Sequence, residues 1–133
     1  MATHEFLKAN ETLSVSSRRD FRKWLAKHHA KKKRIWLVLY KKSSGKQGVT
    51  PLDALEEAIC YGWIDTRIRS INAERYAMQF VPRRKGSTWS EYNKGVALRM
   101  LRQGKMTRNG ISVLPADLLR WRGQVGKKVQ STE

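Results

Sequence analysis

The chain changes its hydrophobic period at Gly62. Before this glycine, residues 50–61 open with a Thr-Pro capping pattern and repeat apolar side chains at helical spacing. After it, residues 63–71 alternate between two faces, as a β-strand does. A turn over residues 72–74 and a second strand over residues 75–81 then predict an antiparallel hairpin. A helix that runs straight into a hairpin favours an α+β domain over a doubly wound parallel sheet.

Local patterns of the same kind predict the remaining elements. A helix is expected over residues 17–29, where Ser17 and Asp20 resemble a capping box ahead of a helical apolar stripe. The continuous apolar run over residues 35–40 predicts a buried central strand. The rest of the chain is expected to hold an exposed loop over residues 41–48, a helix over residues 90–103 and a helix over residues 107–121 that Pro115 interrupts. The predicted order is helix, strand, helix, strand, strand, helix, helix.

The length of 133 residues restricts the chain to one domain. We expect that domain over residues 17–122, followed by a C-terminal tail over residues 123–133. Residues 1–16 are expected to form an N-terminal arm that either contains a short strand or stays mobile. Helical spacing predicts burial of Leu52, Leu55, Ala58 and Ile59 in one helix, and of Tyr92, Val96, Met100 and Leu101 in a later one.

The charge of the chain is strongly positive. Lys and Arg number 28 and Asp and Glu number 11, which gives a net charge of +17. Such a field attracts phosphates, nucleic acid or an anionic membrane surface. The basic residues concentrate in residues 18–42 and 83–108, whereas acids gather at Asp53, Glu56 and Glu57. Charge alone does not separate a solvated basic surface from one that binds anions.

Several classes of site and location are disfavoured because their sequence patterns are missing. The longest apolar run, residues 35–40, is too short to cross a bilayer, and no secretory signal is evident, so we expect a cytoplasmic protein. Cys60 is the only cysteine, which fits a reducing compartment, and we expect it to be a small buried residue. The histidines lack metal-site spacing, residues 43–48 do not match a phosphate-binding P-loop, and no hydrolase motif occurs. We therefore expect no metal and no cofactor, and a binding protein rather than an enzyme.

The polar face of the predicted hairpin is the leading candidate for a ligand site. On a regular strand Asp65 and Arg67 project to the same side, about 7 Å apart. The basic loop over residues 83–87 precedes a helix, whose N-terminal amides favour a phosphate, carboxylate or sulfate. The alternative is an ion pair on the sheet surface, beside tryptophans that only fill the core.

Four strings in the chain resemble those of one protein family. They are residues 35–42 (IWLVLYKK), residues 50–65 (TPLDALEEAICYGWID), residues 76–90 (YAMQFVPRRKGSTWS) and residues 105–107 (KMT) followed by Gly110. In this order they resemble the YdeI/OmdA family, described as bacteriocin-protection or OmpD-associated proteins. The resemblance covers residues 21–114, and it implies a small helix-and-strand protein associated with peptide-stress tolerance, without an established reaction, substrate or cofactor. The chain departs from the family pattern at residues 66–70 and in the basic segment before Ile35.

The resemblance, together with the hairpin face, defines a candidate ligand site. Its residues are Trp36, Tyr40, Lys41, Trp63, Asp65, Arg83, Arg84, Lys85, Ser87, Trp89 and Ser90. We expect the cations of residues 83–85 to hydrogen-bond an anionic small molecule such as a phosphate or nucleotide. Asp65 is expected to orient an arginine or a donor group of the ligand.

Two other functions stay open from the sequence. The first is non-specific binding of nucleic acid by a basic helix and the turn that follows it. The residues predicted to carry it are Arg18, Arg22, Lys31, Lys32, Lys33 and Arg34. The second is an enzyme in which Asp65 acts as a base beside an arginine-stabilised anion. The oligomeric state does not follow from the sequence.

Overall fold

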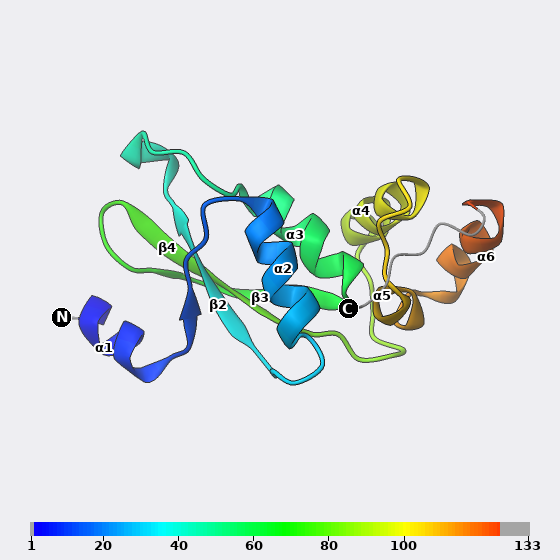
Figure 1. Ribbon diagram of the computed structural model, residues 1–133, viewed down its shortest axis with the longest axis horizontal. Helices are drawn as coiled ribbons and strands as arrows, with labels where there is room; N and C mark the ends of the chain where they lie inside the picture. Colours follow the sequence, from blue (N-terminus) through cyan, green and yellow to red (C-terminus); the bar gives the residue numbers. More distant parts are fainter. Residues whose placement is uncertain (1, 126–133) are drawn as a thin grey trace.

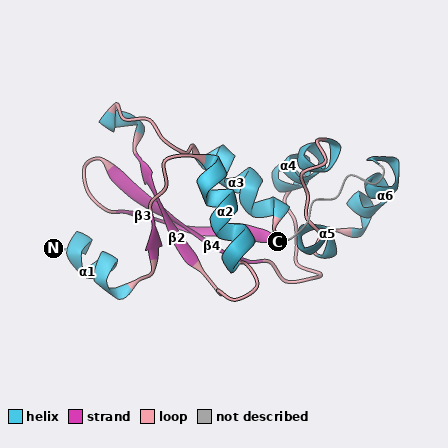
Figure 2. Cartoon of the chain, in the orientation of Figure 1, coloured by secondary structure: helices cyan, strands magenta, loops and turns pink. Residues whose placement is uncertain are grey.

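Four strands form one mixed sheet in the order β1-β2-β4-β3 (Figure 1 and Figure 2). β1 (Thr12–Leu13) runs parallel to β2 (Ile35–Tyr40), and β4 (Arg75–Pro82) lies antiparallel between β2 and β3 (Trp63–Ser70). The computed structural model describes residues 2–125. The helices are α1 (Ala2–Ala9), α2 (Arg18–His28), the short 3-10 helix η1 (Lys42–Ser44), α3 (Pro51–Cys60), α4 (Glu91–Arg102), α5 (Arg108–Ser112) and α6 (Ala116–Val125). The predicted α+β domain with its antiparallel hairpin is confirmed.

The two faces of the sheet differ in what covers them. α2 and α3 lie across one face, which we call the helix face, whereas α1 and the group α4 to α6 lie at opposite ends of the molecule (Figure 1). The main core forms on the helix face, where Phe21 and Leu25 of α2 pack with Leu37 of β2 and Phe80 of β4. A smaller cluster forms on the opposite side, which we call the open face. Its buried members are Phe6, Trp36, Val38, Ile71 and Ala77.

Side-chain caps fix where the helices begin. Ser17, Thr50, Ser90 and Thr107 each accept a hydrogen bond from the backbone N–H three residues ahead. Each cap satisfies an amide that the helix itself leaves without a partner. Gly62, which follows the α3 C-cap residue Tyr61, takes a left-handed conformation with φ of 77°. The predicted starts at Ser17 and Thr50 and the predicted stop at Gly62 are confirmed.

Residues 105–107 (Lys-Met-Thr) and Gly110 lie against the C-terminal end of α3. Thr107 donates from its hydroxyl to the Cys60 carbonyl at 2.6 Å and from its backbone N–H to the same oxygen at 3.0 Å. A Cβ placed on Gly110 would lie 2.8 Å from the carbonyl carbon of Cys60, so no larger residue fits without a backbone shift. This motif therefore joins α5 to α3.

A β-bulge in β3 overturns one prediction about the hairpin. Asp65 pairs with Phe80, but Arg67 pairs with Gln79, so Thr66 is an extra residue in the ladder. Because Phe80 and Gln79 are neighbours in β4 and point to opposite faces, Asp65 follows the helix face and Arg67 the open face. The prediction that Asp65 and Arg67 project to one side was wrong, because regular alternation does not hold through a bulge.

Other departures from the predictions concern burial and the chain ends. Leu52 is 41% exposed and Tyr92 is 63% exposed, although both were predicted to be buried. The N-terminal arm holds the short strand β1 but also α1, which the sequence analysis did not predict. α6 runs to Val125, past the predicted end at residue 121, and residues 126–133 of the predicted tail lie outside the described residues. None of the helices within residues 2–125 has both the length and the apolar character needed to span a bilayer.

Candidate functional site

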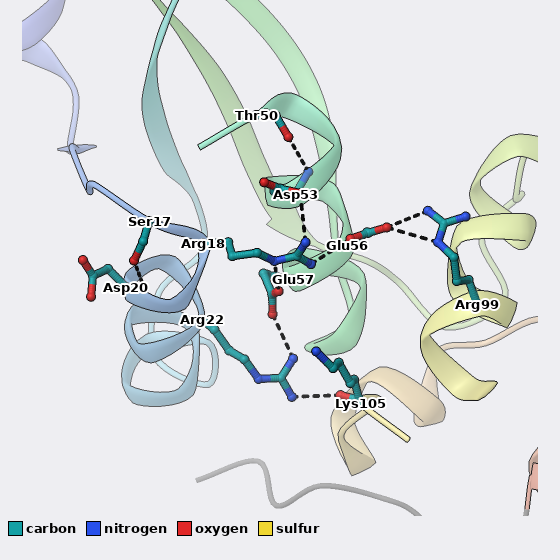
Figure 3. A network of polar contacts seen from close by, with 10 residues as sticks. All are labelled: Ser17, Arg18, Asp20, Arg22, Thr50, Asp53, Glu56, Glu57, Arg99 and Lys105. Atoms are coloured by element: carbon teal, nitrogen blue, oxygen red, sulfur yellow. Dashed lines mark hydrogen bonds and ion pairs between the residues drawn. The ribbon is translucent and has the colours of Figure 1, made fainter. Parts of the chain in front are cut away.

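Arg18, the first residue of α2, binds three carboxylates of α3 at once (Figure 3). Its contacts are Nη1 to Asp53 at 2.8 Å, Nη2 to Glu56 at 2.7 Å and Nε to Glu57 at 2.7 Å. Glu57 is only 3% exposed. A carboxylate this deeply buried needs such partners, because burying an unpaired charge is costly.

Two more arginines extend this group into a network, which we call the carboxylate network (Figure 3). Arg22 donates to Glu57 at 2.9 Å and to the Lys105 carbonyl at 2.8 Å, and Arg99 of α4 donates to Glu56 at 2.6 Å. Burial alone would raise the pKa of Glu56, but the hydrogen bonds from Arg99 and Arg18 outweigh it and lower that pKa. The network therefore links α2, α3 and α4 with charges that are already compensated.

The carboxylate network changes the predicted nucleic-acid surface. Arg18 and Arg22 were predicted to contact phosphates together with residues 31–34, but both are engaged with carboxylates of α3. Lys32 forms an ion pair with Glu11 at 3.1 Å. Within residues 2–125, no ion pair involves Lys31, Lys33 or Arg34, and all three are exposed. The part of this surface that remains available to an anion is the turn before β2.

The predicted loop over residues 83–90 is organised around Arg83. The Arg83 guanidinium lies 3.9 Å from the centre of the Trp89 ring and donates to Ser87 Oγ and to the Thr88 carbonyl, each at 3.0 Å. Burial lowers the pKa of Arg83, and the negative charge of Asp65 offsets part of that effect. The structure therefore brings together Asp65, Arg83, Ser87 and Trp89. Arg83 Nη1 donates within the loop itself, whereas the buried Arg83 Nε has no hydrogen-bond partner in the described structure.

The other predicted site residues of this loop have different environments. Arg84 and Lys85 are exposed, and no ion pair in the described part of the chain involves them. Ser90 accepts from the Asn93 N–H at 3.1 Å, so its hydroxyl caps α4. Arg84 and Lys85 can therefore attract an anion at the surface of the loop.

The remaining predicted site residues lie elsewhere. Tyr40 and Lys41 are at the hairpin end of β2, because Tyr40 pairs with Arg75, whereas residue 83 follows the far end of β4. Lys41 donates to Ser70 Oγ at 2.7 Å. Trp63 is buried in the helix-face core, and Trp36 is buried on the open face. The structure thus distributes the predicted set over both faces and both ends of the sheet.

A cavity of about 200 Å³ on the open face gathers a different set of cations. We call it the arginine pocket. Its lining residues are Phe6, Asn10, Arg34, Trp36, Arg67, Ile68, Arg69 and Gln79. Arg67 lies 6.0 Å from the centre of the Trp36 ring, and Arg69 lies 5.0 Å from that of Phe6. The lining contains three guanidinium groups and no carboxylate.

Trp36, which lines the arginine pocket, carries a buried donor without an acceptor. Trp36 is 5% exposed, and its indole Nε1 has no hydrogen-bond partner in the described structure. Arg34, Arg67 and Arg69 likewise form no ion pair within residues 2–125. The three guanidinium groups without an ion pair around this cavity suit an acceptor with negative charge.

Sequence reasoning identified only part of this pocket. Arg34, Trp36 and Arg67 were singled out, but for three different roles, and Phe6, Asn10, Arg69 and Gln79 were not proposed as ligand contacts. The bulge at Thr66 places Arg67 and Arg69 on the open face beside Trp36. The sequence signal that was available is the alternation of Arg67 and Arg69 themselves, which places both on one face of β3.

Metal or thiol chemistry is not favoured by the described residues. Within residues 2–125, no group of three or more His, Cys, Asp or Glu side chains has an arrangement that could hold a metal ion. Cys60 is buried, and this burial raises its pKa to about 11, although the nearby Arg22 partly opposes the effect. Cys60 is therefore a packing residue, as predicted, and not an activated nucleophile.

Comparison with known proteins gives a family but no activity. A family model described as Domain of unknown function (DUF8412) matches residues 13–113, which include the strands from β2 to β4 and the helices from α2 to α5. No curated protein and no solved structure matches the chain. The matched region covers Arg34, Arg67 and Arg69 but not α1. The chain belongs to the DUF8412 family of domains.

Proposed function

We propose that the protein binds an anionic ligand in the arginine pocket on the open face of the sheet. The observation that carries this proposal is the contrast between two sets of arginines. Arg18, Arg22 and Arg99 are compensated by carboxylates, whereas Arg34, Arg67 and Arg69 line a cavity without any carboxylate. A cavity that concentrates unpaired guanidinium groups lowers the free energy of an anion placed in it.

The recognition chemistry follows from the donors around the cavity. Guanidinium groups hydrogen-bond phosphate or carboxylate oxygens through pairs of N–H groups. The Trp36 ring and the carboxamides of Asn10 and Gln79 lie in the same lining, where the Asn10 amide already donates to the Phe6 carbonyl at 2.9 Å. Gln79 Oε1 already accepts a bond from Thr66 Oγ1 at 3.0 Å, so the Gln79 side chain offers a ligand its NH₂ donors. The pocket suits a small phosphate-bearing ligand.

Isothermal titration calorimetry with inorganic pyrophosphate and with adenosine monophosphate tests the proposal. We expect Arg67→Gln and Arg69→Gln to weaken binding by about tenfold each, because each removes one charge-assisted contact. Arg19→Gln is the matched control, since it removes one exposed positive charge from α2 outside the pocket. Arg84→Gln tests the alternative anion site, which is the loop over residues 83–87 proposed from the sequence. Equal losses in the control and the pocket variants contradict the proposed site.

A second candidate function is binding to the backbone of nucleic acid. It is favoured by the turn before β2, where Lys31, Lys33 and Arg34 are exposed and Arg34 also lines the arginine pocket. Such binding depends on counterion release and therefore falls steeply as salt rises. Affinity for a short single-stranded oligonucleotide should fall less steeply with salt in the double variant Lys31→Gln and Lys33→Gln. An unchanged salt slope contradicts this function.

The resemblance to the YdeI/OmdA family also stays a proposal. Its motifs include residues with defined structural roles, such as Thr107 and Gly110 at the end of α3. The arginine pocket, however, takes Arg67 and Arg69 from the segment where the chain departs from that family pattern. We therefore propose the arginine pocket as a feature of this chain that the resemblance does not imply. We also propose a cytoplasmic location, because the single cysteine is a buried free thiol, which suits a reducing compartment.

A further inference from the structure

Part of one edge of β2 has no partner strand. β1 pairs only Thr12 with Trp36 and Leu13 with Leu37. The chain then continues through residues 14–16, and a cavity of about 420 Å³ lies between them, residues 38–40 and residues 47–49. We call this the edge cavity. Its volume falls within the range of about 300–1,000 Å³ that is usual for ligand sites in proteins.

Backbone groups of β2 point toward the edge cavity. The Trp36 N–H points to the β1 side, where it donates to the Glu11 carbonyl at 3.2 Å, whereas the Lys41 N–H points to the other side and donates to Glu74. Peptide groups alternate along a strand, so the N–H and C=O of Tyr40 point to the same side as those of Trp36. Tyr40 lies beyond the last residue pair with β1, and its edge groups have no strand partner within residues 2–125.

The lining of the edge cavity carries a positive charge and no negative charge. Arg75 lines it and is half-buried, and no ion pair within the described residues involves Arg75. The preceding residue, Glu74, forms an ion pair with Lys46 at 2.9 Å. None of the lining residues is a carboxylate, and the other side chains are apolar or uncharged polar, such as Val49 and Ser16. The cavity therefore combines a strand edge, an apolar wall and one uncompensated cation.

We propose that the edge cavity binds an extended acidic peptide segment of a partner protein. The segment adds as a strand beside residues 38–40, with its backbone hydrogen-bonded to Tyr40 and a carboxylate paired with Arg75. Strand addition supplies affinity through main-chain hydrogen bonds and selectivity through alternate side chains. An acidic segment fits because the cavity lacks negative charge and the chain carries a net charge of +17. This proposal does not depend on the arginine pocket, which lies on another part of the sheet.

Fluorescence anisotropy with a peptide library provides the test. The library contains terminally blocked peptides of about six residues, the usual length of a strand, that alternate Val or Thr with Glu or Asp. We expect saturable binding that weakens about tenfold with Arg75→Gln and about tenfold when the peptide amide opposite Tyr40 is N-methylated. Arg108→Gln is the control, because Arg108 is exposed on α5, lines neither cavity, and its loss lowers the net charge as much as Arg75→Gln does. Circular dichroism verifies that both variants fold.

Three results would overturn the proposal. The first is the absence of binding by any library peptide at about 1 mM, which corresponds to roughly 4 kcal/mol of binding free energy. The second is equal affinity for N-methylated and unmodified peptides, which would indicate adsorption by charge alone. The third is a dimer in sedimentation equilibrium that Arg75→Gln abolishes, because the occupant of the edge would then be a second copy of this chain.

Discussion

Arg18 and Glu57 are 39 positions apart in the sequence, yet the Arg18 Nε lies 2.7 Å from the Glu57 Oε2. The pair joins α2 to α3, and Glu57 accepts a second bond from Arg22 at 2.9 Å. Removing the carboxylate leaves two partly buried guanidinium groups short of an acceptor. We expect Glu57→Gln to reduce the free energy of unfolding by about 3 kcal/mol in urea denaturation.

The matched control for Glu57→Gln is Glu91→Gln. The Glu91 side chain is 92% exposed, and its contact with Lys94 is 3.5 Å long. Exposed ion pairs contribute little, so this variant should change stability by no more than about 0.5 kcal/mol. Similar losses in both variants would contradict a stabilising carboxylate network.

The pH dependence of stability should reflect Glu56. Hydrogen bonds from Arg99 and Arg18 hold the pKa of Glu56 below its ordinary value despite burial. A carboxyl whose pKa is lower when folded contributes stability above its unfolded pKa of about 4.3 and loses it as the pH falls through the folded pKa. The stability difference between wild type and Glu56→Gln should therefore be larger at neutral pH than in acid. Stability is measured by urea unfolding at both pH values. If the difference between wild type and Glu56→Gln grows on acidification, this prediction is contradicted.

Two glycines should respond in opposite directions to the same substitution. A Cβ at Gly110 would meet the Cys60 carbonyl group and the Met106 side chain, so Gly110→Ala should lower the melting temperature and cost more than about 2 kcal/mol. Gly95 is an exposed glycine within α4 and has nothing within 4 Å of an added Cβ. Gly95→Ala should stabilise the protein by up to about 1 kcal/mol. A neutral Gly110→Ala would show that α5 does not pack against α3 as described.

The Cys60 thiol should be inert in the folded protein. Burial raises its pKa to about 11, so the reactive thiolate is scarce at pH 8 and the sulfur is shielded from solvent. A disulfide reagent that releases a chromophore should react within seconds in denaturant and very slowly without it. Rapid reaction of the native protein would contradict the burial of Cys60.

The sequence predicted the elements better than it predicted the site. Caps at Ser17 and Thr50, the glycine stop at Gly62 and the apolar run of β2 are local signals, and the structure contains all of them. α1 was missed because its first residues carry few apolar side chains and its buried Phe6 packs against Trp36 from a distant strand. Such a helix depends on tertiary packing more than on its own sequence.

The arginine pocket could not be predicted from the sequence, because it depends on two features of the fold that are not local in the sequence. One is the bulge at Thr66, which moves Arg67 to the face opposite Asp65 and cannot be read from alternation. The other is which basic residues have acidic partners. Arg18 and Arg34 look alike in the sequence, but only the fold brings the α3 carboxylates to Arg18.

The indole resonance of Trp36 tests the central claim most directly. Trp36 and Trp63 both carry a buried Nε1 without a hydrogen-bond partner in the described structure, but they lie on opposite faces of the sheet. In nitrogen–proton NMR spectra titrated with pyrophosphate and with adenosine monophosphate, we predict a saturable shift of the Trp36 indole N–H while that of Trp63 stays in place. Equal shifts of both indoles, or no shift of Trp36 while the ligand binds elsewhere, would contradict an anion site in the arginine pocket.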